Sequence, residues 1–314
     1  MTNDDFTAWA LHRFPGRVKR DEPMARHTSF GVGGPADLFV SVKDEKQLRE
    51  LVLACVEAGV PYTAVAGGTN LLVLDRGIRG VVIDMKKGLK DIRVDGDAGD
   101  VVTVRAGAGV NLQSLCQYAI DNGLAGMNFA LGIPGTVGGA VIMNAGTARG
   151  AMGDVLETVT ILTSDGRLMK AARDDMVFRY RHFEVRGFSP DAADPFLVTA
   201  ARLSCRREEP VRLRAEARDI LNERMRSHPV GVRSAGCFFK NPAEGESAGR
   251  LIDRAGLKGR RVGGAAVSDK HANYIVNTGG ATAADILTLM AEVRREVAER
   301  FGVRLEPEVK IVGE

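Results

Sequence analysis

Hydrophobic positions recur along the chain at two spacings, one typical of amphipathic helices and one typical of strands. Asp44-Glu45-Lys46-Gln47 resembles a capping box, and its helix is expected to end at Gly59-Val60-Pro61 and to bury Leu48, Leu51, Val52, Cys55 and Val56. A second helix is predicted from Asn111 to Asn122-Gly123, burying Leu112, Leu115, Cys116, Ala119 and Ile120. Apolar runs at 62–66, 71–74, 81–84 and 102–105 predict strands around them.

The composition of the chain changes near residue 206. Strands are expected near 155–163 and 196–205 before this point, and a charged helix ending at His228-Pro229 after it. Helices near 247–255 and 282–301 then alternate with apolar strands at 262–267 and 274–277, and Thr282 with Asp285 is expected to cap the last helix. A surface loop is expected at 191–194. This pattern predicts an α+β protein with a domain boundary near residue 206.

Composition narrows the class of protein. The 314 residues favour about two domains, and 45% hydrophobic residues with 26% charged residues are ordinary for a soluble globular protein. A net charge of +3 gives no argument for nucleic-acid binding. No apolar run approaches the roughly 18 residues of a membrane span, and the acidic N-terminus lacks a signal-peptide core. Cys55, Cys116 and Cys205 lie in apolar patterns and are expected as core thiols, which favours a reducing, cytoplasmic location.

Glycines concentrate in Gly132-Ile133-Pro134-Gly135-Thr136-Val137-Gly138-Gly139-Ala140, which Met143-Asn144-Ala145-Gly146 follows. Glycine weakens helices and strands and proline removes a donor, so this stretch is expected where the backbone turns sharply and approaches something closely. Successive N–H groups could point at one anion, with the Thr136 hydroxyl beside them. The flanking apolar segments favour a phosphate or cofactor site over a surface turn. The spacing is neither that of a P-loop nor that of the dinucleotide-binding fingerprint.

A second glycine loop, Gly67-Gly68-Thr69-Asn70, lies between two strand-like apolar runs. It repeats the order of the first loop, with a hydroxyl and an amide close behind the glycines. Two such loops indicate two walls around one long, phosphate-bearing ligand.

The second half of the chain contains Ser234-Ala235-Gly236-Cys237-Phe238-Phe239-Lys240-Asn241-Pro242. Cys237 could be a nucleophile, a proton donor or a core residue. An unperturbed thiol has a pKa of about 8.5 and is mostly protonated at neutral pH, which suits an acid. A nucleophile would need a nearby base or cation, which Lys240 could supply.

Three other positions carry candidate chemistry. The aromatic and basic run at 178–183 fits either a site or a solvated turn, and Glu308 places a carboxylate in an otherwise apolar terminal strand. His271 precedes a strand and could line a pocket, although a single histidine there is more often structural. No spacing of His, Cys, Asp and Glu resembles a metal site.

An ordered set of motifs from about residue 24 to the C-terminus resembles the UDP-N-acetylenolpyruvoylglucosamine reductase family, also called UDP-N-acetylmuramate dehydrogenases. The motifs are His27-Thr28-Ser29-Phe30 with Gly33-Gly34-Pro35-Ala36, Gly67-Gly68-Thr69-Asn70-Leu71-Leu72, the loop at 132–139, Asn144-Ala145-Gly146, Tyr180-Arg181, the segment at 236–242 and Pro307-Glu308-Val309. Each glycine motif alone is weak, but seven motifs in family order are specific. The compact length resembles the shorter of two family types, which lacks a lid loop with a tyrosine.

The resemblance implies a two-lobed FAD-binding domain of the vanillyl-alcohol-oxidase type and a smaller α/β substrate-binding domain. It places an N-terminal leader at 1–23, the FAD-binding domain at 24–206 with lobes at about 24–90 and 91–206, and the substrate-binding domain at 207–301. Residues 302–314 are expected as a terminal strand that returns to the active site.

The resemblance also implies a reaction in peptidoglycan precursor synthesis. In such enzymes NADPH reduces FAD and leaves, and the enolpyruvyl ether of UDP-N-acetylglucosamine then enters the same site. Hydride passes to the terminal vinyl carbon and the neighbouring carbon is protonated. A cytoplasmic monomer that binds neither nucleic acid nor membrane is expected.

Family roles carry over to matching positions. Arg181 would stabilise the charge of the intermediate, Glu308 would assist at the carboxylate, and Cys237 would donate the proton. Residues expected to contact the substrate are Tyr180, Lys240, Asn241 and Asn273. Residues expected to hold FAD are Gly67, Gly68, Thr69, Asn70, Leu71, Gly132, Ile133, Pro134, Gly135, Thr136, Gly138, Gly139 and Asn144.

Two positions depart from the family pattern, and two other functions compete with it. Cys237 stands where the family's donor is usually a serine, and Phe183 stands where a serine usually follows the Tyr-Arg motif. A different flavoprotein of the same fold, such as an alcohol or lactone oxidase, would explain the glycine loops alone. A non-catalytic regulator that binds FAD or a nucleotide sugar would not require Arg181, Cys237 and Glu308 to converge.

Overall fold

The computed structural model describes residues 3–188 and 195–314, so the loop expected at 191–194 lies outside the described residues. Two compact units make up the chain. The first comprises Met1–Lys19, Leu38–Gly67 and Gly80–Asn222, and the second comprises Arg20–Asp37, Gly68–Arg79 and Glu223–Glu314. Both units are therefore assembled from separate stretches of sequence, unlike the contiguous segments expected above. The assignment of functions to 24–206 and 207–301 stays a prediction.

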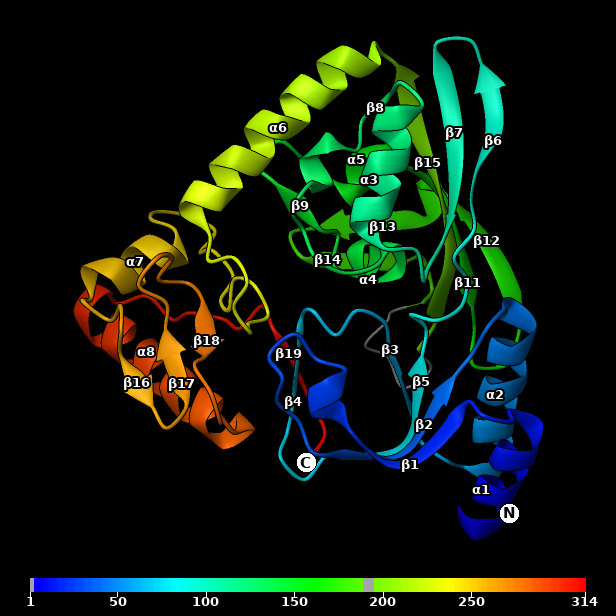
Figure 1. The fold of residues 1–314 in the computed structure, drawn as a ribbon, viewed down its shortest axis with the longest axis horizontal. Helices are drawn as coiled ribbons and strands as arrows, with labels where there is room; N and C mark the ends of the chain where they lie inside the picture. Colours follow the sequence, from blue (N-terminus) through cyan, green and yellow to red (C-terminus); the bar gives the residue numbers. More distant parts are fainter. Residues whose placement is uncertain (1–2, 189–194) are drawn as a thin grey trace. The chain divides into compact units, whose positions relative to one another are not determined.

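The first unit is built on a six-stranded sheet with the order β12-β11-β15-β7-β6, in which β8 also pairs with β15. Every pairing between these strands is antiparallel. The short helix α4 packs on β15 and β7, and α3 lies beside β8 (Figure 1). The strands are β6 (Ile92–Ala98), β7 (Val101–Gly107), β8 (Leu124–Ala125), β11 (Leu156–Leu162), β12 (Leu168–Ala172) and β15 (Leu197–Arg207), and the helices are α3 (Leu112–Asp121) and α4 (Val137–Ile142).

Helix α3 matches the prediction in its start, its end and its buried face. The Asn111 side chain accepts hydrogen bonds from the N–H groups of Gln113 at 2.9 Å and Ser114 at 3.2 Å, which satisfies two of the free donors of the first turn. The expected apolar positions, Leu112, Leu115, Cys116, Ala119 and Ile120, are all buried.

A four-stranded sheet has the order β1-β2-β5-β3, and most of its residues belong to the first unit. Its strands are β1 (Val18–Pro23), β2 (Pro35–Ser41), β3 (Tyr62–Val65) and β5 (Ile78–Asp84), and the helices of this region are α1 (Asn3–Arg13) and α2 (Glu45–Ala58). Asp44 caps α2 by accepting from the N–H of Gln47 at 2.8 Å, and Gly59 ends it in the left-handed conformation at φ 64°. Val56 was expected in the core but is 51% exposed, because it lies at the edge of the helical stripe formed by Leu48, Leu51, Val52 and Cys55.

Smaller elements complete the first unit. A hairpin of β13 (Met176–Arg179) and β14 (His182–Val185) carries the aromatic and basic run at its turn. The others are β9 (Gly146–Thr147), β10 (Gly150–Ala151) and α5 (Met152–Val155).

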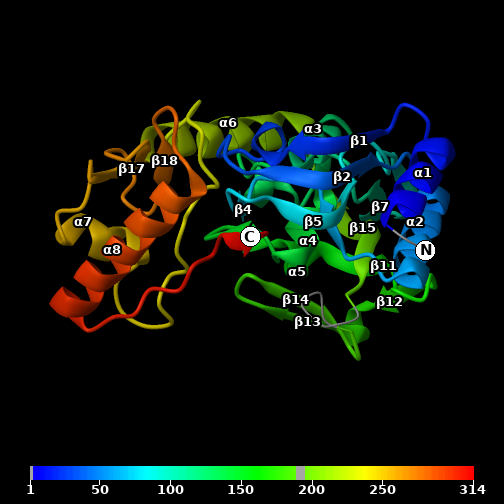
Figure 2. The ribbon, with the colours of Figure 1, turned by 90° about the horizontal axis from the view of Figure 1, so that it is seen from below.

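The second unit has its own core, in which α7 and α8 pack together and α8 also packs on the three-stranded sheet β16-β17-β18 (Figure 2). Phe30, Phe238 and Phe239 lie in this core. The strands are β16 (Arg261–Val262), β17 (Ala265–Val267) and β18 (Ile275–Asn277), the helices are α7 (Ala248–Arg254) and α8 (Ala283–Phe301), and α6 (Pro210–Ser227) leads into the unit. Thr282 caps α8 by accepting from the N–H of Asp285 at 3.0 Å, as predicted. Within the described stretches, no helix combines the length and apolarity needed to cross a membrane.

The end of the chain pairs with an early strand of the same unit. Strand β19 (Lys310–Val312) runs parallel to β4 (Leu71–Val73), with Ile311 opposite Leu72. The terminal strand expected at 302–314 is therefore wrong in extent, since residues 302–309 form no strand and only Lys310–Val312 pair with β4.

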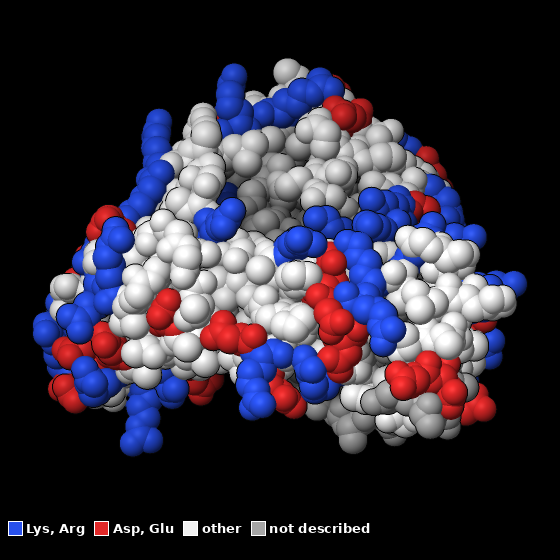
Figure 3. Space-filling model, turned by 60° about the horizontal axis from the view of Figure 1, so that its bottom comes forward, with Lys and Arg blue, Asp and Glu red and all other residues white. Residues whose placement is uncertain are grey.

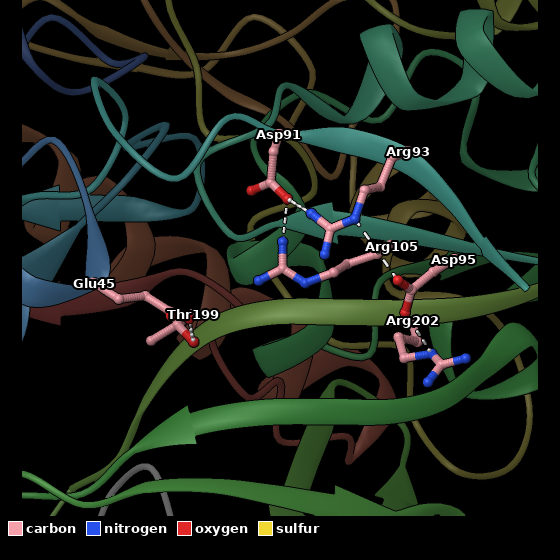
Figure 4. Close-up of polar contacts among 7 residues, drawn as sticks. All are labelled: Glu45, Asp91, Arg93, Asp95, Arg105, Thr199 and Arg202. Atoms are coloured by element: carbon pink, nitrogen blue, oxygen red, sulfur yellow. Dashed lines mark hydrogen bonds and ion pairs between the residues drawn. The ribbon is translucent and has the colours of Figure 1, made fainter.

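Charged side chains on the six-stranded sheet pair with one another. Asp91 accepts from Arg93 at 2.8 Å and also binds Arg105, and Asp95 lies 3.2 Å from Arg202 (Figure 4). Acidic and basic side chains are likewise both spread over the face shown in Figure 3. Asp91 and Arg93 are exposed, and a pair of that kind contributes at most about 1 kcal/mol, whereas Arg105, Asp95 and Arg202 are half-buried.

Beside that ladder, a buried threonine joins α2 to the sheet. The Thr199 hydroxyl donates to Glu45 Oε1 at 2.6 Å (Figure 4). Thr199 is fully buried, so this bond satisfies a hydroxyl that would otherwise be costly to bury.

Candidate functional site

The first glycine loop is held by hydrogen bonds to its own unit. Five backbone N–H groups of the loop donate hydrogen bonds to oxygen atoms of the protein, those of Gly132, Ile133, Val137, Gly138 and Gly139. Thr136 is buried, and its hydroxyl caps α4 by accepting from the Gly139 N–H at 3.4 Å. The expectation that successive N–H groups point at one anion is therefore wrong for these groups. The glycines serve first to let the loop turn and pack, as the φ values of +76° at Gly132 and +124° at Gly135 require.

Two neighbouring glycines of α4 differ in what surrounds them. A Cβ at Gly138 would lie 2.8 Å from the Ala108 Cβ, so Gly138 is required by packing inside the protein. A Cβ at Gly139 would meet only the Thr136 Oγ1, at 3.7 Å, and Gly139 is exposed. Packing within the first unit therefore does not require glycine at position 139. The absence of a side chain there leaves the backbone of the loop accessible.

Asn144 holds the hairpin that carries the Tyr-Arg motif. Its backbone is left-handed at φ 38°, and its amide donates to the Arg179 carbonyl at 3.0 Å and accepts from the Gly153 N–H at 2.9 Å. Asn144, expected to contact the cofactor, is thus engaged in fixing the start of the Tyr180-Arg181 turn.

Arg181 sits at the turn of the hairpin in a left-handed conformation, φ 56°. Its guanidinium lies 4.9 Å from the centroid of the Tyr180 ring, and Tyr180 is 51% exposed. A cation over an aromatic face restrains both side chains. Phe183 is fully buried and packs on Phe178 with ring centroids 5.2 Å apart, so the departure from serine at this position fills the core.

In the second unit, the other glycine loop passes very close to the backbone of an early motif. Gly68 has φ +60°, and a Cβ there would lie 1.9 Å from the His27 carbonyl oxygen, so only glycine fits. The Ser29 N–H donates to the Gly68 carbonyl at 3.0 Å. The Ser29 hydroxyl is buried and finds no hydrogen-bond partner among the described residues. Sequence reasoning assigned Ser29 no role, because nothing in the sequence shows that its hydroxyl is left unsatisfied.

Asn70 links this loop to Glu308. Its side-chain amide donates to the Glu308 backbone carbonyl at 3.1 Å, and its backbone carbonyl accepts from the Lys310 N–H at 3.0 Å. The cofactor-binding prediction for Asn70 is not tested by these bonds, but they show that the loop positions the backbone of Glu308.

Cys237 and Glu308 lie on two segments that run side by side. Phe239 and Pro307 form an antiparallel bridge, and the Glu308 N–H donates to the Phe238 carbonyl at 2.8 Å. Cys237, unlike the other three cysteines, is partly exposed. The structure therefore brings the backbone segments of a thiol and a carboxylate, which are far apart in the sequence, side by side.

Asn273 is placed behind this segment. It is only 3% exposed, and its amide accepts from the Phe239 N–H at 2.9 Å and donates to the Phe239 carbonyl at 2.8 Å. This geometry gives Asn273 a structural role, and its expected contact with the substrate stays a prediction.

Lys240 and Asn241 follow on the accessible side. The Lys240 ammonium lies 3.6 Å from a Glu306 carboxylate oxygen, and both side chains are exposed by more than a third. The Asn241 side chain accepts from the Ala248 N–H at 3.1 Å, near the start of α7. Their expected contact with the diphosphate stays a prediction.

A buried aromatic cluster that the sequence did not reveal lies next to Cys237. Tyr274 is 7% exposed, and its backbone lies beside that of Cys237, because the Phe238 N–H donates to the Asn273 carbonyl at 2.7 Å. Its ring centroid lies 5.1 Å from His271 and 5.8 Å from His228. Burial raises the pKa of Tyr274 above its usual range, and the charge of Cys237 acts in the same direction. Burial also lowers the pKa of His228 to about 4.

The remaining cysteines are core thiols, as predicted. Burial raises the pKa of both Cys55 and Cys116 to about 12 and that of Cys205 to about 11. All three are buried, so they are chemically inert compared with Cys237.

Each glycine loop, considered by itself, fits a large cofactor with phosphate groups. In the second unit, the orphaned Ser29 hydroxyl beside Gly68 can donate to an anionic oxygen. In the first unit, a ligand can make close van der Waals contact with the accessible backbone at Gly139. Within the described ranges, no group of three or more His, Cys, Asp and Glu side chains is arranged to hold a metal ion.

Two family models match separate parts of the chain. Residues 36–172 match the family described as FAD binding domain, and residues 228–312 match the C-terminal domain of UDP-N-acetylenolpyruvoylglucosamine reductase. The fold class is confirmed in its main features: the chain is an α+β protein with an FAD-binding domain and a smaller second domain.

Relatives cover nearly the whole chain. The UDP-N-acetylenolpyruvoylglucosamine reductase of Desulfosudis oleivorans is 53% identical over 309 residues, covering 98% of this chain and 99% of its own. The enzyme of the same name from Geobacter metallireducens is 44% identical over 312 residues, covering 99% of both chains. The crystal structure of UDP-N-acetylenolpyruvylglucosamine reductase from Thermus caldophilus superposes with a TM-score of 0.79 at 36% identity, covering 95% of this chain and 99% of its own. The chain therefore belongs to the UDP-N-acetylenolpyruvoylglucosamine reductase family, in its shorter type, and is an FAD-dependent oxidoreductase.

Proposed function

We propose that this chain reduces UDP-N-acetylglucosamine enolpyruvate to UDP-N-acetylmuramate with NADPH as reductant, as a cytoplasmic monomer in peptidoglycan precursor synthesis. The observation that carries the proposal is the pairing of the Cys237 segment with the Glu308 segment through Phe239 and Pro307. An acid and a carboxylate carried on paired backbone segments suit a reaction that ends in protonation of the carbon next to the substrate's carboxylate.

FAD is proposed to lie against the two glycine loops. The residues that would hold it are Gly67, Gly68, Thr69, Asn70, Leu71, Gly132, Ile133, Pro134, Gly135, Thr136, Gly138 and Gly139, and Ser29 joins them through its unsatisfied hydroxyl. When bound, the flavin supplies hydride chemistry that no side chain can perform. Asn144 is proposed to act indirectly, because its amide fixes the hairpin that carries Tyr180 and Arg181.

Cys237 is proposed to deliver the proton. Its S–H bond breaks, the proton joins the carbon next to the substrate carboxylate, and the electron pair stays on sulfur as a thiolate. Unlike the buried thiols, Cys237 is accessible for this transfer and for reprotonation from solvent. Glu308 is proposed to assist at the carboxylate end of the substrate, and Arg181 to supply fixed positive charge for the negative charge that develops.

Three exposed side chains are proposed to bind the remainder of the substrate. Lys240 and Asn241 would contact the diphosphate, where a mobile ammonium and an amide can each meet a phosphate oxygen. Tyr180 would contact the substrate beside Arg181, to which its ring is already apposed.

Anaerobic stopped-flow absorbance tests the function. The flavin of the purified protein is reduced with NADPH and then mixed with UDP-N-acetylglucosamine enolpyruvate. Rapid return of the oxidised flavin spectrum without oxygen is expected. Reoxidation by oxygen alone would favour an oxidase of the same fold, and a protein that binds no added FAD would contradict the assignment of the two loops. Repeating the first step with NADH measures how strictly NADPH is preferred.

A further inference from the structure

One acidic side chain of the second unit is buried close to the turn that carries Ser29. Glu22 is 5% exposed and is the buried residue of β1, whose other positions are exposed or half-buried. Asp21, directly before it, has a left-handed backbone at φ 48°, which residues other than glycine rarely adopt. A buried carboxylate and a left-handed non-glycine residue both cost free energy, so their occurrence at adjacent positions indicates a function.

Glu22 is paired with the first residue of the His27-Thr28-Ser29-Phe30 motif. Its Oε1 lies 2.9 Å from His27 Nε2, and since a carboxylate can only accept, the imidazole ring donates this hydrogen bond. The Arg26 guanidinium also approaches Glu22, but at 3.7 Å and from an exposed position, whereas His27 is half-buried. His27 is therefore the principal partner of the buried carboxylate.

The backbone around His27 is held by the neighbouring chain. The His27 N–H donates to the carbonyl of Met24 at 2.8 Å, and Met24 is fully buried. The Met24 N–H donates in turn to the Gly34 carbonyl at 2.9 Å, and the Ala25 N–H donates to the Gly33 carbonyl at 3.1 Å. With its main chain fixed by these bonds and its ring fixed by Glu22, His27 presents its carbonyl at one place.

This carbonyl is the group against which the second glycine loop packs. A Cβ at Gly68 would lie 1.9 Å from the His27 carbonyl oxygen and 3.1 Å from the Thr28 Cα. The Ser29 N–H donates to the Gly68 carbonyl at 3.0 Å, and the buried Ser29 hydroxyl has no hydrogen-bond partner in the part of the chain that the structure describes. A displacement of His27 would move both the loop and this hydroxyl, because no space between them can absorb it.

We propose that Glu22 is a positioning residue for the FAD site, which fixes His27 against Gly68 and thereby holds the Ser29 hydroxyl where it can donate to an anionic oxygen of the cofactor. The inference rests on the proposed function, because only there does FAD lie against this loop. Glu22 acts through His27 and not by contact with the cofactor, since a carboxylate would repel a phosphate group. Binding sites depend on such supporting hydrogen bonds to keep the contacting groups in place.

The first test is amide hydrogen exchange, measured residue by residue in the full-length, FAD-free protein, for the wild type, Glu22→Ala and Glu22→Gln. Glutamine keeps an oxygen that can accept from His27, and alanine removes it. Glu292→Ala is the matched control, because Glu292 lies in α8 of the same unit and loses its bond from Arg260, which is also 2.9 Å long.

We expect the Ser29 N–H to exchange about tenfold faster in Glu22→Ala, because its bond to Gly68 opens more often. Glu22→Gln and Glu292→Ala should exchange this hydrogen at nearly the rate of the wild type. An unchanged rate in Glu22→Ala would overturn the proposal. If Glu22→Ala does not fold, His27→Phe removes the same hydrogen bond from the other partner, keeps a ring, and should show the same acceleration.

The second test is FAD affinity, measured by flavin fluorescence. Glu22→Ala should bind FAD about tenfold more weakly, and Glu22→Gln should recover most of this loss. Wild-type affinity in Glu22→Ala would overturn the proposal.

A double-mutant cycle separates positioning from general destabilisation. Ser29→Ala removes the hydroxyl that Glu22 is proposed to place, so Glu22→Ala should weaken FAD binding much less in the Ser29→Ala background. Equal weakening in both backgrounds would assign Glu22 a purely structural role and overturn the proposal. A wild type that binds no FAD would instead contradict the proposed function, and the exchange rate of the Ser29 N–H would still decide whether Glu22 holds this turn.

Discussion

The amide of Asn273 forms two hydrogen bonds with the backbone of Phe239, accepting from its N–H at 2.9 Å and donating to its carbonyl at 2.8 Å. A third bond, from the Phe238 N–H to the Asn273 carbonyl at 2.7 Å, continues the pairing. Asn273 thus replaces a neighbouring strand for the segment that begins with Cys237. The position of the thiol depends on a residue that lies buried behind it.

Asn273→Ala should lower the free energy of unfolding by about 1–3 kcal/mol, because it leaves the buried Phe239 N–H and carbonyl without partners. Urea denaturation measures this loss. The KM for the UDP substrate should change less than kcat, since the side chain does not reach the surface. Unchanged stability together with a large rise in KM would contradict this and support a direct substrate contact.

Gly138 and Gly139 provide a matched pair for the cofactor loop. Gly138→Ala should destabilise the protein by about 1–3 kcal/mol, since its Cβ would lie 2.8 Å from the Ala108 Cβ. Gly139→Ala should leave thermal unfolding of the FAD-free protein unchanged or slightly higher, because alanine favours the helix and space is open. FAD affinity, measured by flavin fluorescence, should nevertheless fall in Gly139→Ala. Wild-type affinity in that variant would show that FAD does not approach this edge.

Stability should decrease as the pH falls from about 6.5 to about 4. The pKa of His228 is lowered from 6.5 to about 4 by burial, so within this window the unfolded chain binds a proton that the folded chain does not. Stability that is present above the unfolded pKa is therefore lost on acidification. His228→Gln should flatten this part of the pH dependence.

Urea midpoints at pH 7, 6 and 5 check this prediction, with His12→Gln on the exposed face of α1 as the control. Parallel curves for the wild type and His228→Gln would contradict it. His271 should contribute in the same direction, because burial lowers its pKa as well.

Local signals in the sequence predicted much of the secondary structure. Asp44, Asn111 and Thr282 cap the helices that they were expected to open, because capping depends on groups within one turn. The hairpin around Arg181 was not predicted. Its short strands carry mixed aromatic and charged residues with no clear alternation, which also suits a solvated turn.

The sequence did not predict which segments form each unit or which residues lie next to Cys237. Asn70 holds Glu308 across 238 positions, and Asn273 holds Phe239 across 34. Such pairs are set by the tertiary fold, so no local pattern identifies them. Asn273 and Tyr274 adjoin one another in the sequence, yet one supports the backbone of the Cys237 segment and the other packs against the rings of His228 and His271.

The most direct test of the account compares the two half-reactions in Cys237→Ala, Cys237→Ser and the wild type by anaerobic stopped-flow absorbance. Reduction of the flavin by NADPH should be nearly unchanged in all three. Reoxidation by UDP-N-acetylglucosamine enolpyruvate should slow roughly 100-fold or more in Cys237→Ala and keep a substantial rate in Cys237→Ser, because a hydroxyl can also donate the proton. Equal slowing of both half-reactions in Cys237→Ala, or none in either, would contradict the assignment of Cys237 as the proton donor.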